Sequence, residues 1–225
     1  MGWGPDVIGA WLGIPASTVH RAIRRLRLQA PKVRPAPAIR YEYQLPGQMI
    51  HVDTKKLGRI GKGPGHRAHG DRTTRNRGIG WEVMHVAVDD ATRLAYSELL
   101  PDERSRTAAL FLVRALRWFR EQGFTTQRVL TDNGNPYRSK AWRRVCRLTG
   151  VRHRFTRPYH PQTNGKVERW IRSALSESLY LEVFNSADER RLALQRYLRY
   201  YNDHRPHLGI GGVPPRQRLL SRLAA

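Results

Sequence analysis

The chain has 225 residues, and 41 Lys and Arg against 18 Asp and Glu give it a formal net charge of +23. This excess favours nucleic acid as the partner over an anionic membrane surface, which usually needs a basic amphipathic helix with a clean apolar face. The single cysteine, Cys146, excludes an internal disulfide framework and a zinc site built from several cysteines. With no signal peptide and no apolar run near the ~20 residues that span a membrane, we expect a cytoplasmic, nucleoid-associated protein.

Residues 1–28 have the pattern of a partial helix-turn-helix segment that binds DNA. Two helical runs meet at Gly13, and Val19, Ile23 and Leu26 recur at helical spacing in the second run. The alternative is an ordinary two-helix hairpin with a charged outer face. On the second helix we expect outward side chains suited to base edges and phosphates, namely Ser17, Thr18, His20, Arg21, Arg24 and Arg25.

Residues 29–47 contain four prolines and no periodicity, so they predict a semi-extended linker. From residue 48 the pattern alternates between strands and helices, and we assign residues 48–185 to one core and 186–225 to a helical C-terminal extension. The expected elements are a strand ending on Asp53, a hairpin over 81–100, a helix over 105–123, a strand closing on Asp132, a helix over 139–150, a strand over 151–159, and helices over 164–184 and 187–201. This order predicts an α/β fold with a mixed sheet flanked by helices.

A long basic segment over residues 55–77 separates the first strand from the hairpin. It holds eight Lys or Arg residues against one Asp, with five Gly among them. A loop of this length is either functional or disordered. We expect it to contact phosphates through Lys55, Lys56, Arg59, Lys62 and Arg67.

Three carboxylates stand where chemistry is expected. Asp53 and Asp132 end strands, and if both strands pair at the centre of the sheet, their carboxyl ends lie side by side. Glu168 lies in the first turn or so of a helix. Taken singly, Asp132 would be a turn residue and Glu168 a surface residue. Together, three oxygen donors without a Cys or multi-His cluster suit Mg²⁺ or Mn²⁺.

Other acidic residues are less promising. Asp89, Asp90 and Asp102 fall in the expected hairpin turn and in the loop that follows the hairpin, so we expect them to be solvated.

The segments VDT, TDNG and RPYHPQTNGKVERW resemble the DDE catalytic core of transposases and retroviral integrases. The 35 residues 133–167 separate Asp132 from Glu168, as in that family's D,D-35-E motif. The residues around Glu168, with YYNDHRPH near the C-terminus, are most similar to bacterial insertion-sequence transposases. The resemblance covers about residues 40–220.

The resemblance implies an RNase H-like fold with a five-stranded sheet and two Mg²⁺ or Mn²⁺ ions per active site. Their ligands, and the catalytic residues, would be Asp53, Asp132 and Glu168. It implies double-stranded DNA as partner, both as transposon terminal inverted repeats and as target, and a homodimer or higher oligomer on that DNA. Family members carry more helix-turn-helix sequence ahead of this point, so we expect the N-terminal motif to be partial.

Residues around the glutamate extend this expectation. Arg172 shares the helix face of Glu168, where it would hold a DNA phosphate or pair with the glutamate. Arg157 and Lys166, with His160 and Gln162, fall in the connecting loop and are expected DNA contacts.

Two questions stay open at this level. The cluster from Tyr200 to His207 favours packing or DNA contact over a metal site, because Pro206 ends the helix between its histidines. An RNase H-like nuclease without strand transfer, and a catalytically silent DNA-binding regulator, are the alternative functions.

Overall fold

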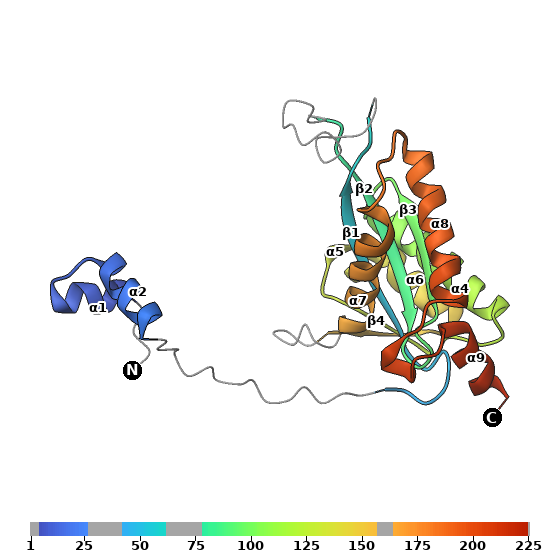
Figure 1. Ribbon diagram of the computed structural model, residues 1–225. Helices are drawn as coiled ribbons and strands as arrows, with labels where there is room; N and C mark the ends of the chain where they lie inside the picture. Colours follow the sequence, from blue (N-terminus) through green and yellow to red (C-terminus); the bar gives the residue numbers. More distant parts are fainter. Residues whose placement is uncertain (1–4, 27–41, 62–77, 157–163, 225) are drawn as a thin grey trace. The chain divides into compact units, whose positions relative to one another are not determined.

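The computed structural model describes residues 5–26, 42–61, 78–156 and 164–224 (Figure 1). These residues belong to two compact units, residues 1–40 and residues 41–225. None of the described helices is long and apolar enough to cross a membrane.

The first unit consists of helices α1 (Pro5–Leu12) and α2 (Ala16–Arg25), as the sequence predicts. The turn between them is tight, because the backbone N–H of Ile14 donates to the carbonyl of Gly9 at 3.0 Å. A Cβ on Gly9 would lie 2.7 Å from the carbonyl oxygen of Ile14, so this close approach needs glycine. Val19 of α2 is buried.

The second unit is built on a five-stranded sheet with the order β3-β2-β1-β4-β5. The strands are β1 (Ile50–Gly58), β2 (Trp81–Asp89), β3 (Ala95–Leu100), β4 (Arg128–Thr131) and β5 (Arg152–Phe155). β1 pairs antiparallel with β2, as β2 does with β3, whereas β1 with β4 and β4 with β5 are parallel. The predicted α/β fold with a mixed five-stranded sheet flanked by helices is therefore confirmed.

We expected strand β1 to end on Asp53, but it continues to Gly58. Its pairing with β2 runs unbroken to Gly58 opposite Trp81. The chain continues as a strand because Leu57 is buried while Lys55 and Lys56 stay exposed. Asp53 consequently projects from the middle of a strand.

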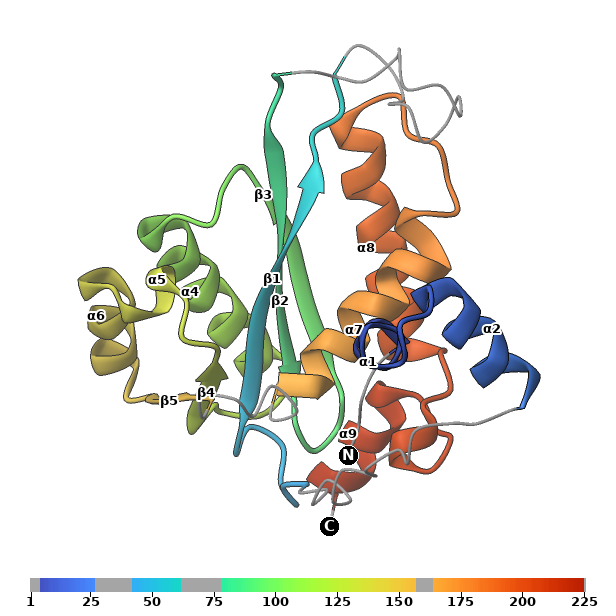
Figure 2. The same ribbon diagram turned by 90° about the vertical axis from the view of Figure 1, so that its left-hand side faces the viewer.

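Helices cover both faces of the sheet (Figure 2). On one face, α4 (Ser105–Glu121) and α6 (Lys140–Thr149) pack on a core that includes Val52, Val129 and the buried thiol of Cys146. On the other face, α7 (Gly165–Ala174) and α8 (Ala187–Asp203) pack on Met84, Val86 and other residues of the strands.

The helix expected over 164–184 is shorter in the structure. After α7 a π-helical turn, η3 (Leu175–Leu179), ends the segment with a bond from the N–H of Tyr180 to the carbonyl of Leu175 at 2.9 Å. Two short elements lacked a periodic signal of sufficient length and were not predicted: α5 (Asn135–Arg138) and η4 (Leu208–Ile210). Helix α9 (Pro215–Leu223) lies in the helical extension expected over 186–225.

The C-terminal helices belong to the same unit as the sheet. The side chain of Asn202 accepts a hydrogen bond from the N–H of Ala95 at 2.9 Å and donates one to the carbonyl of Ala95 at 2.8 Å. These two bonds attach α8 to the edge strand β3. Residues 42–47, which we expected in the linker, also belong here, since the N–H of Gly47 donates to Asp89 at 2.8 Å. Tertiary bonds of this kind leave no periodic trace in a sequence.

The cluster from Tyr200 to His207 contributes to packing. Tyr201 is buried and lies edge-on to the ring of His207, and Arg205 donates to both carboxylate oxygens of Glu177. The Nδ1 atom of His207 is buried without a hydrogen-bond partner among the residues that the structure describes.

Burial, together with the charges of Arg93 and Arg205, lowers the pKa of His207 from its ordinary 6.5 to about 4. Between pH 4 and 6.5 the imidazole is therefore protonated in the unfolded chain but neutral in the folded chain. Any contribution of His207 to stability is consequently complete above pH 6.5 and is lost as the pH falls toward 4. We expect the stability gap between the parent and His207→Gln, measured by urea unfolding, to shrink across this range. A gap that stays constant with pH would contradict the assignment.

Candidate active site

Asp53 lies on the face of the sheet that α7 covers. Successive side chains of a strand point to opposite faces, so Asp53 points away from Val52, which packs under α4 and α6. It points to the same face as Leu57, which packs under α7. The N–H of Thr54 donates to Asp53 Oδ1 at 2.8 Å. The side chain is half-buried, so it borders both the core and solvent.

Asp132 follows the last residue of β4. The parallel register pairs Ile50 with Val129 and His51 with Leu130, and the same offset carried forward sets Asp53 opposite Asp132. The N–H of Gly134 donates to Asp132 Oδ1 at 2.9 Å, which closes a turn and leaves the aspartate exposed. Asp132 is therefore a turn residue and, in the same geometry, is exposed at the end of β4, where a site residue was expected.

Gly134 offers a test of how closely this carboxylate must be placed. A Cβ on Gly134 would lie 2.9 Å from Asp132 Oδ1, so Gly134→Ala must displace the carboxylate. We expect strand transfer in the assay described below to fall by up to roughly a hundredfold, because a shift of about 1 Å in a catalytic group can cost that much. Gly58→Ala is the matched control, since nothing lies within 4 Å of a Cβ there. Equal activities of the two variants would contradict this role.

Glu168 stands in the first turn of α7. Val167, Trp170 and Ile171 of this helix are buried against the sheet, so the helical period turns Glu168 outward to solvent. Its position near the amino end of the helix favours a negative charge.

The charges of the three carboxylates act on one another. Burial, with the nearby charges of Asp132 and Glu168, raises the pKa of Asp53 from 3.8 to about 6, against the lowering effect of the Thr54 N–H. Repulsion of this kind arises when carboxylates share a region, and a bound cation relieves it. The structure thus brings the carboxylates of strand β1, the end of β4 and the start of α7 into one negatively charged site.

Tyr137 is a residue of this place that the sequence analysis missed. It is buried, and its pKa is raised well above the usual value by burial and by the charges of Asp53 and Asp132. It comes from the short helix α5, which has no periodic signal, and this is why it escaped prediction.

The oxygen donors of the site suit a hard divalent cation in type and charge. Yet nowhere in the described parts of the chain do three His, Cys, Asp or Glu side chains stand close enough to hold a metal ion as they are. The assignment of Asp53, Asp132 and Glu168 as metal ligands therefore stays a prediction.

A pocket of about 380 Å³ opens beside two of the carboxylates. It is lined by Asp53, Thr54, Lys55, Glu168, Ile171, Arg172 and Leu175. Between described residues, no ion pair joins Arg172 to Glu168. The pocket therefore offers two cationic side chains next to two carboxylates. The cations suit a phosphate group, and the carboxylates suit a metal ion bound to that phosphate.

The expected DNA contacts have different surroundings. All six candidates on α2 are exposed, as are Lys55 and Lys56, and Lys56 pairs with Glu103 at 2.6 Å. Arg59 donates to the carbonyl of Pro101 at 3.3 Å. Lys62, Arg67 and Arg157, with His160 and Gln162, lie outside the described residues.

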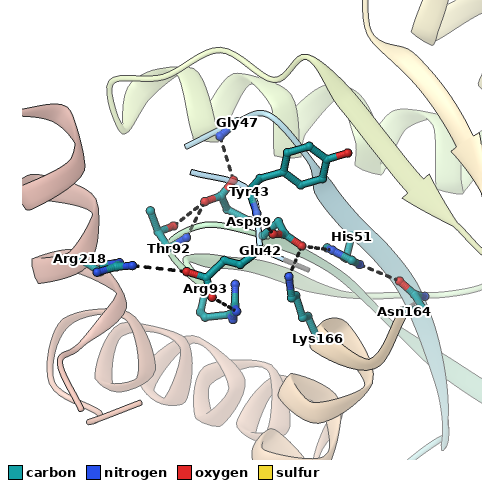
Figure 3. A network of polar contacts seen from close by, with 11 residues as sticks. Glu42, Tyr43, Gly47, His51, Asp89, Thr92, Arg93, Asn164, Lys166 and Arg218 are labelled. Atoms are coloured by element: carbon teal, nitrogen blue, oxygen red, sulfur yellow. Dashed lines mark hydrogen bonds and ion pairs between the residues drawn. The ribbon is translucent and has the colours of Figure 1, made fainter. Parts of the chain in front are cut away.

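Lys166 differs from the expectation. It lies in the first turn of α7 rather than in the loop, and its ammonium contacts Asp90 Oδ1 (Figure 3). The expectation that Asp89 and Asp90 are solvated is wrong, because both are fully buried. Buried carboxylates need donors, and here His51, Lys166 and backbone N–H groups supply them.

The contacts around Asp90 connect the elements that carry the site (Figure 3). His51 Nε2 lies 2.7 Å from Asp90 Oδ1, and His51 Nδ1 lies 3.3 Å from Asn164 Oδ1. Asn164 also donates to the carbonyl of Val52 at 3.4 Å. Burial raises the pKa of Asp90, but the bonds from His51 and Lys166 outweigh it and hold the pKa at about 2. The network thus fastens the start of α7 to β1, next to Asp53.

Comparison with known proteins gives matches over most of the chain. A family model described as an integrase core domain matches residues 44–161, and another with the same description matches residues 149–215. A structure of the catalytic core domain of BIV integrase superposes with a TM-score of 0.54 at 20% identity, covering 79% of this chain and 97% of that one. A simian T-cell lymphotropic virus intasome, in complex with the PP2A regulatory subunit B56 gamma, gives a TM-score of 0.61 at 20% identity, over 96% of this chain and 73% of that one. At this identity the structures show the shared fold.

Proposed function

The chain belongs to the integrase core domain family, and from this premise we propose that it is a DDE-type transposase of a bacterial insertion sequence, which cuts DNA at transposon ends and joins those ends to target DNA. The family supports polynucleotidyl transfer in general. The observation that carries the finer proposal is that burial and the nearby charges of Asp132 and Glu168 raise the pKa of Asp53, beside a pocket lined by Lys55 and Arg172.

The three carboxylates would hold Mg²⁺ or Mn²⁺, two ions per site. When bound, such ions activate the attacking oxygen and neutralise the leaving oxygen of a phosphodiester. Asp53 supplies a charge held between two other carboxylates, and Asp132 is presented by the turn that Gly134 closes. Arg172 and Lys55 would hold a phosphate of the substrate in the pocket.

The partner would be double-stranded DNA. The net charge of +23 supports a polyanionic partner. In the first unit, the outward residues Ser17, Thr18 and Arg21 of α2 suit the recognition of terminal inverted repeats by a partial helix-turn-helix. Because two DNA ends must be paired, we propose a dimer or higher oligomer on DNA, acting in the bacterial nucleoid.

The test is a strand-transfer assay with the full chain. Labelled duplexes that carry the ends of the element encoding the chain are incubated with target plasmid and Mg²⁺, Mn²⁺ or EDTA. We expect metal-dependent joining of the 3′ ends to the plasmid, and none in EDTA. Asp53→Asn and Glu168→Gln should both remove joining, whereas Asp188→Asn, a control on an exposed aspartate of α8, should not.

Other outcomes would favour the alternatives. Metal-dependent hydrolysis without joining would indicate an RNase H-like nuclease. Binding to the ends without cleavage or joining under any metal would indicate a silent DNA-binding regulator.

A further inference from the structure

The exposed face of helix α6 carries four basic side chains and no acidic one. Lys140, Arg143, Arg144 and Arg147, here called the α6 surface, are all exposed. Lys140 is three and four residues before Arg143 and Arg144, and Arg147 is four and three residues after them, so the four share one face of the helix. The opposite face carries the buried Trp142 and Cys146, which pack on the core.

The cations of the α6 surface lack acidic partners. None of the four makes an ion pair with another residue that the structure describes. On other helices some cations are paired, such as Arg117 with Glu121, Arg191 with Asp188, and Arg196 with Glu182. In the sequence, Asp132 is the only acidic residue between Glu121 and Glu168.

This arrangement costs the free protein stability. Like charges three or four residues apart on a helix repel each other, and Lys140 at the amino end also opposes the helix dipole. Arg147, in the last turn, is favourably placed toward the dipole, but no described acidic partner offsets the repulsion among the four cations. A polyanion placed on this face would offset that repulsion.

Helix α6 is connected to the candidate active site through the packing of its buried face. The ring of Trp142 packs on His153 with centroids 5.6 Å apart, and His153 Nε2 lies 2.9 Å from the hydroxyl of Thr131. Thr131 is the last residue of β4 and precedes Asp132. A DNA molecule on α6 would thus lie on a rigid element attached to the strand that presents this carboxylate.

The dimensions of the surface fit a DNA backbone. Lys140 and Arg147 are separated by about 10 Å along the helix axis, at 1.5 Å per residue. Duplex DNA carries one phosphate per ~3.4 Å of its axis on each strand, so one strand has about three phosphates over this length, against four cations. Arginine and lysine bind phosphates without reading the base sequence.

We propose that the α6 surface binds the phosphate backbone of duplex DNA, independently of sequence. This inference rests on the proposed function, because it assigns a further contact to the DNA that the carboxylates would cut or join. The triple variant Arg143→Gln, Arg144→Gln, Arg147→Gln tests it in the full chain. Its matched control is Arg117→Gln, Arg191→Gln, Arg196→Gln, which removes the same charge from cations that have acidic partners.

Affinity for a random-sequence duplex is measured in EDTA at several salt concentrations, so that no chemistry contributes. We expect the slope of log affinity against log salt to become shallower by up to about 3 in the α6 triple, at about 0.9 per phosphate contact. The control triple should change the slope by less than 1. Two duplexes of unrelated sequence should show the same loss. Equal effects of the two triples, or a loss confined to one sequence, would overturn the proposal.

A second measurement uses the unaltered chain, so it does not depend on how a variant folds. Phenylglyoxal modifies exposed arginines, and mass spectrometry reports each site. We expect duplex DNA to protect Arg143, Arg144 and Arg147 but not Arg117 or Arg196, and no protection of α6 would overturn the proposal. Protection without any strand transfer would retain the DNA surface and reject the catalytic proposal, so the two failures are distinguishable.

Discussion

Asp132→Asn is expected to abolish strand transfer, lowering its rate by at least about a thousandfold. The substitution keeps the shape of the side chain but removes one of the three negative charges that would hold the metal ions. Metal ions supply several kcal/mol of transition-state stabilisation, and each ~1.4 kcal/mol corresponds to a tenfold change in rate. The fold should survive, because Asp132 is exposed and its amide oxygen can still accept the N–H of Gly134.

The measurement compares initial rates of joining for the parent, Asp132→Asn and the control Asp188→Asn. Thermal unfolding and duplex binding in EDTA are recorded for each, and both should match the parent within error. If Asp132→Asn joined DNA as fast as the parent, Asp132 would not be a catalytic residue. A variant that loses both joining and stability would show instead that the aspartate is a structural turn residue.

Asp90→Ala is expected to lower the free energy of unfolding by about 3–5 kcal/mol, the usual loss when one partner of a buried ion pair is removed. Asp90 is fully buried and accepts bonds from His51, Lys166 and the N–H of Tyr43. Without it, the bonds that these three donors make to its carboxylate would be lost. Because the network fastens the start of α7 to β1, hydrogen exchange at the start of α7 should also increase.

The loss is measured by urea unfolding followed through tryptophan fluorescence, with the slope against urea compared between proteins. Asp188→Ala is the control, since that side chain is 83% exposed and its pair with Arg191 should contribute less than about 1 kcal/mol. A loss below 1 kcal/mol for Asp90→Ala would show that the network contributes little to stability.

Much of the fold was predictable because its signals are local. The hairpin over 81–100 and the helix that begins at Ser105 follow from the periods of their apolar residues, which side chains and backbone impose over a few residues. Elements without such a period, α5 and η4, were missed, and with α5 the buried Tyr137. Strand β1 was ended too early, because its continuation beyond Asp53 depends on pairing with β2.

The amino-acid sequence by itself determined the basic character of the chain, the order of the main elements and the spacing of Asp132 and Glu168. Only the tertiary structure decided which charges are neutralised. Asp90, an ordinary turn aspartate in the sequence, is buried because residues 39 and 76 positions away supply its donors. The arginines of α6 make no ion pair with any residue that the structure describes. The reason is physical: a charge interacts through space, and the neighbours that set its free energy come from distant parts of the chain.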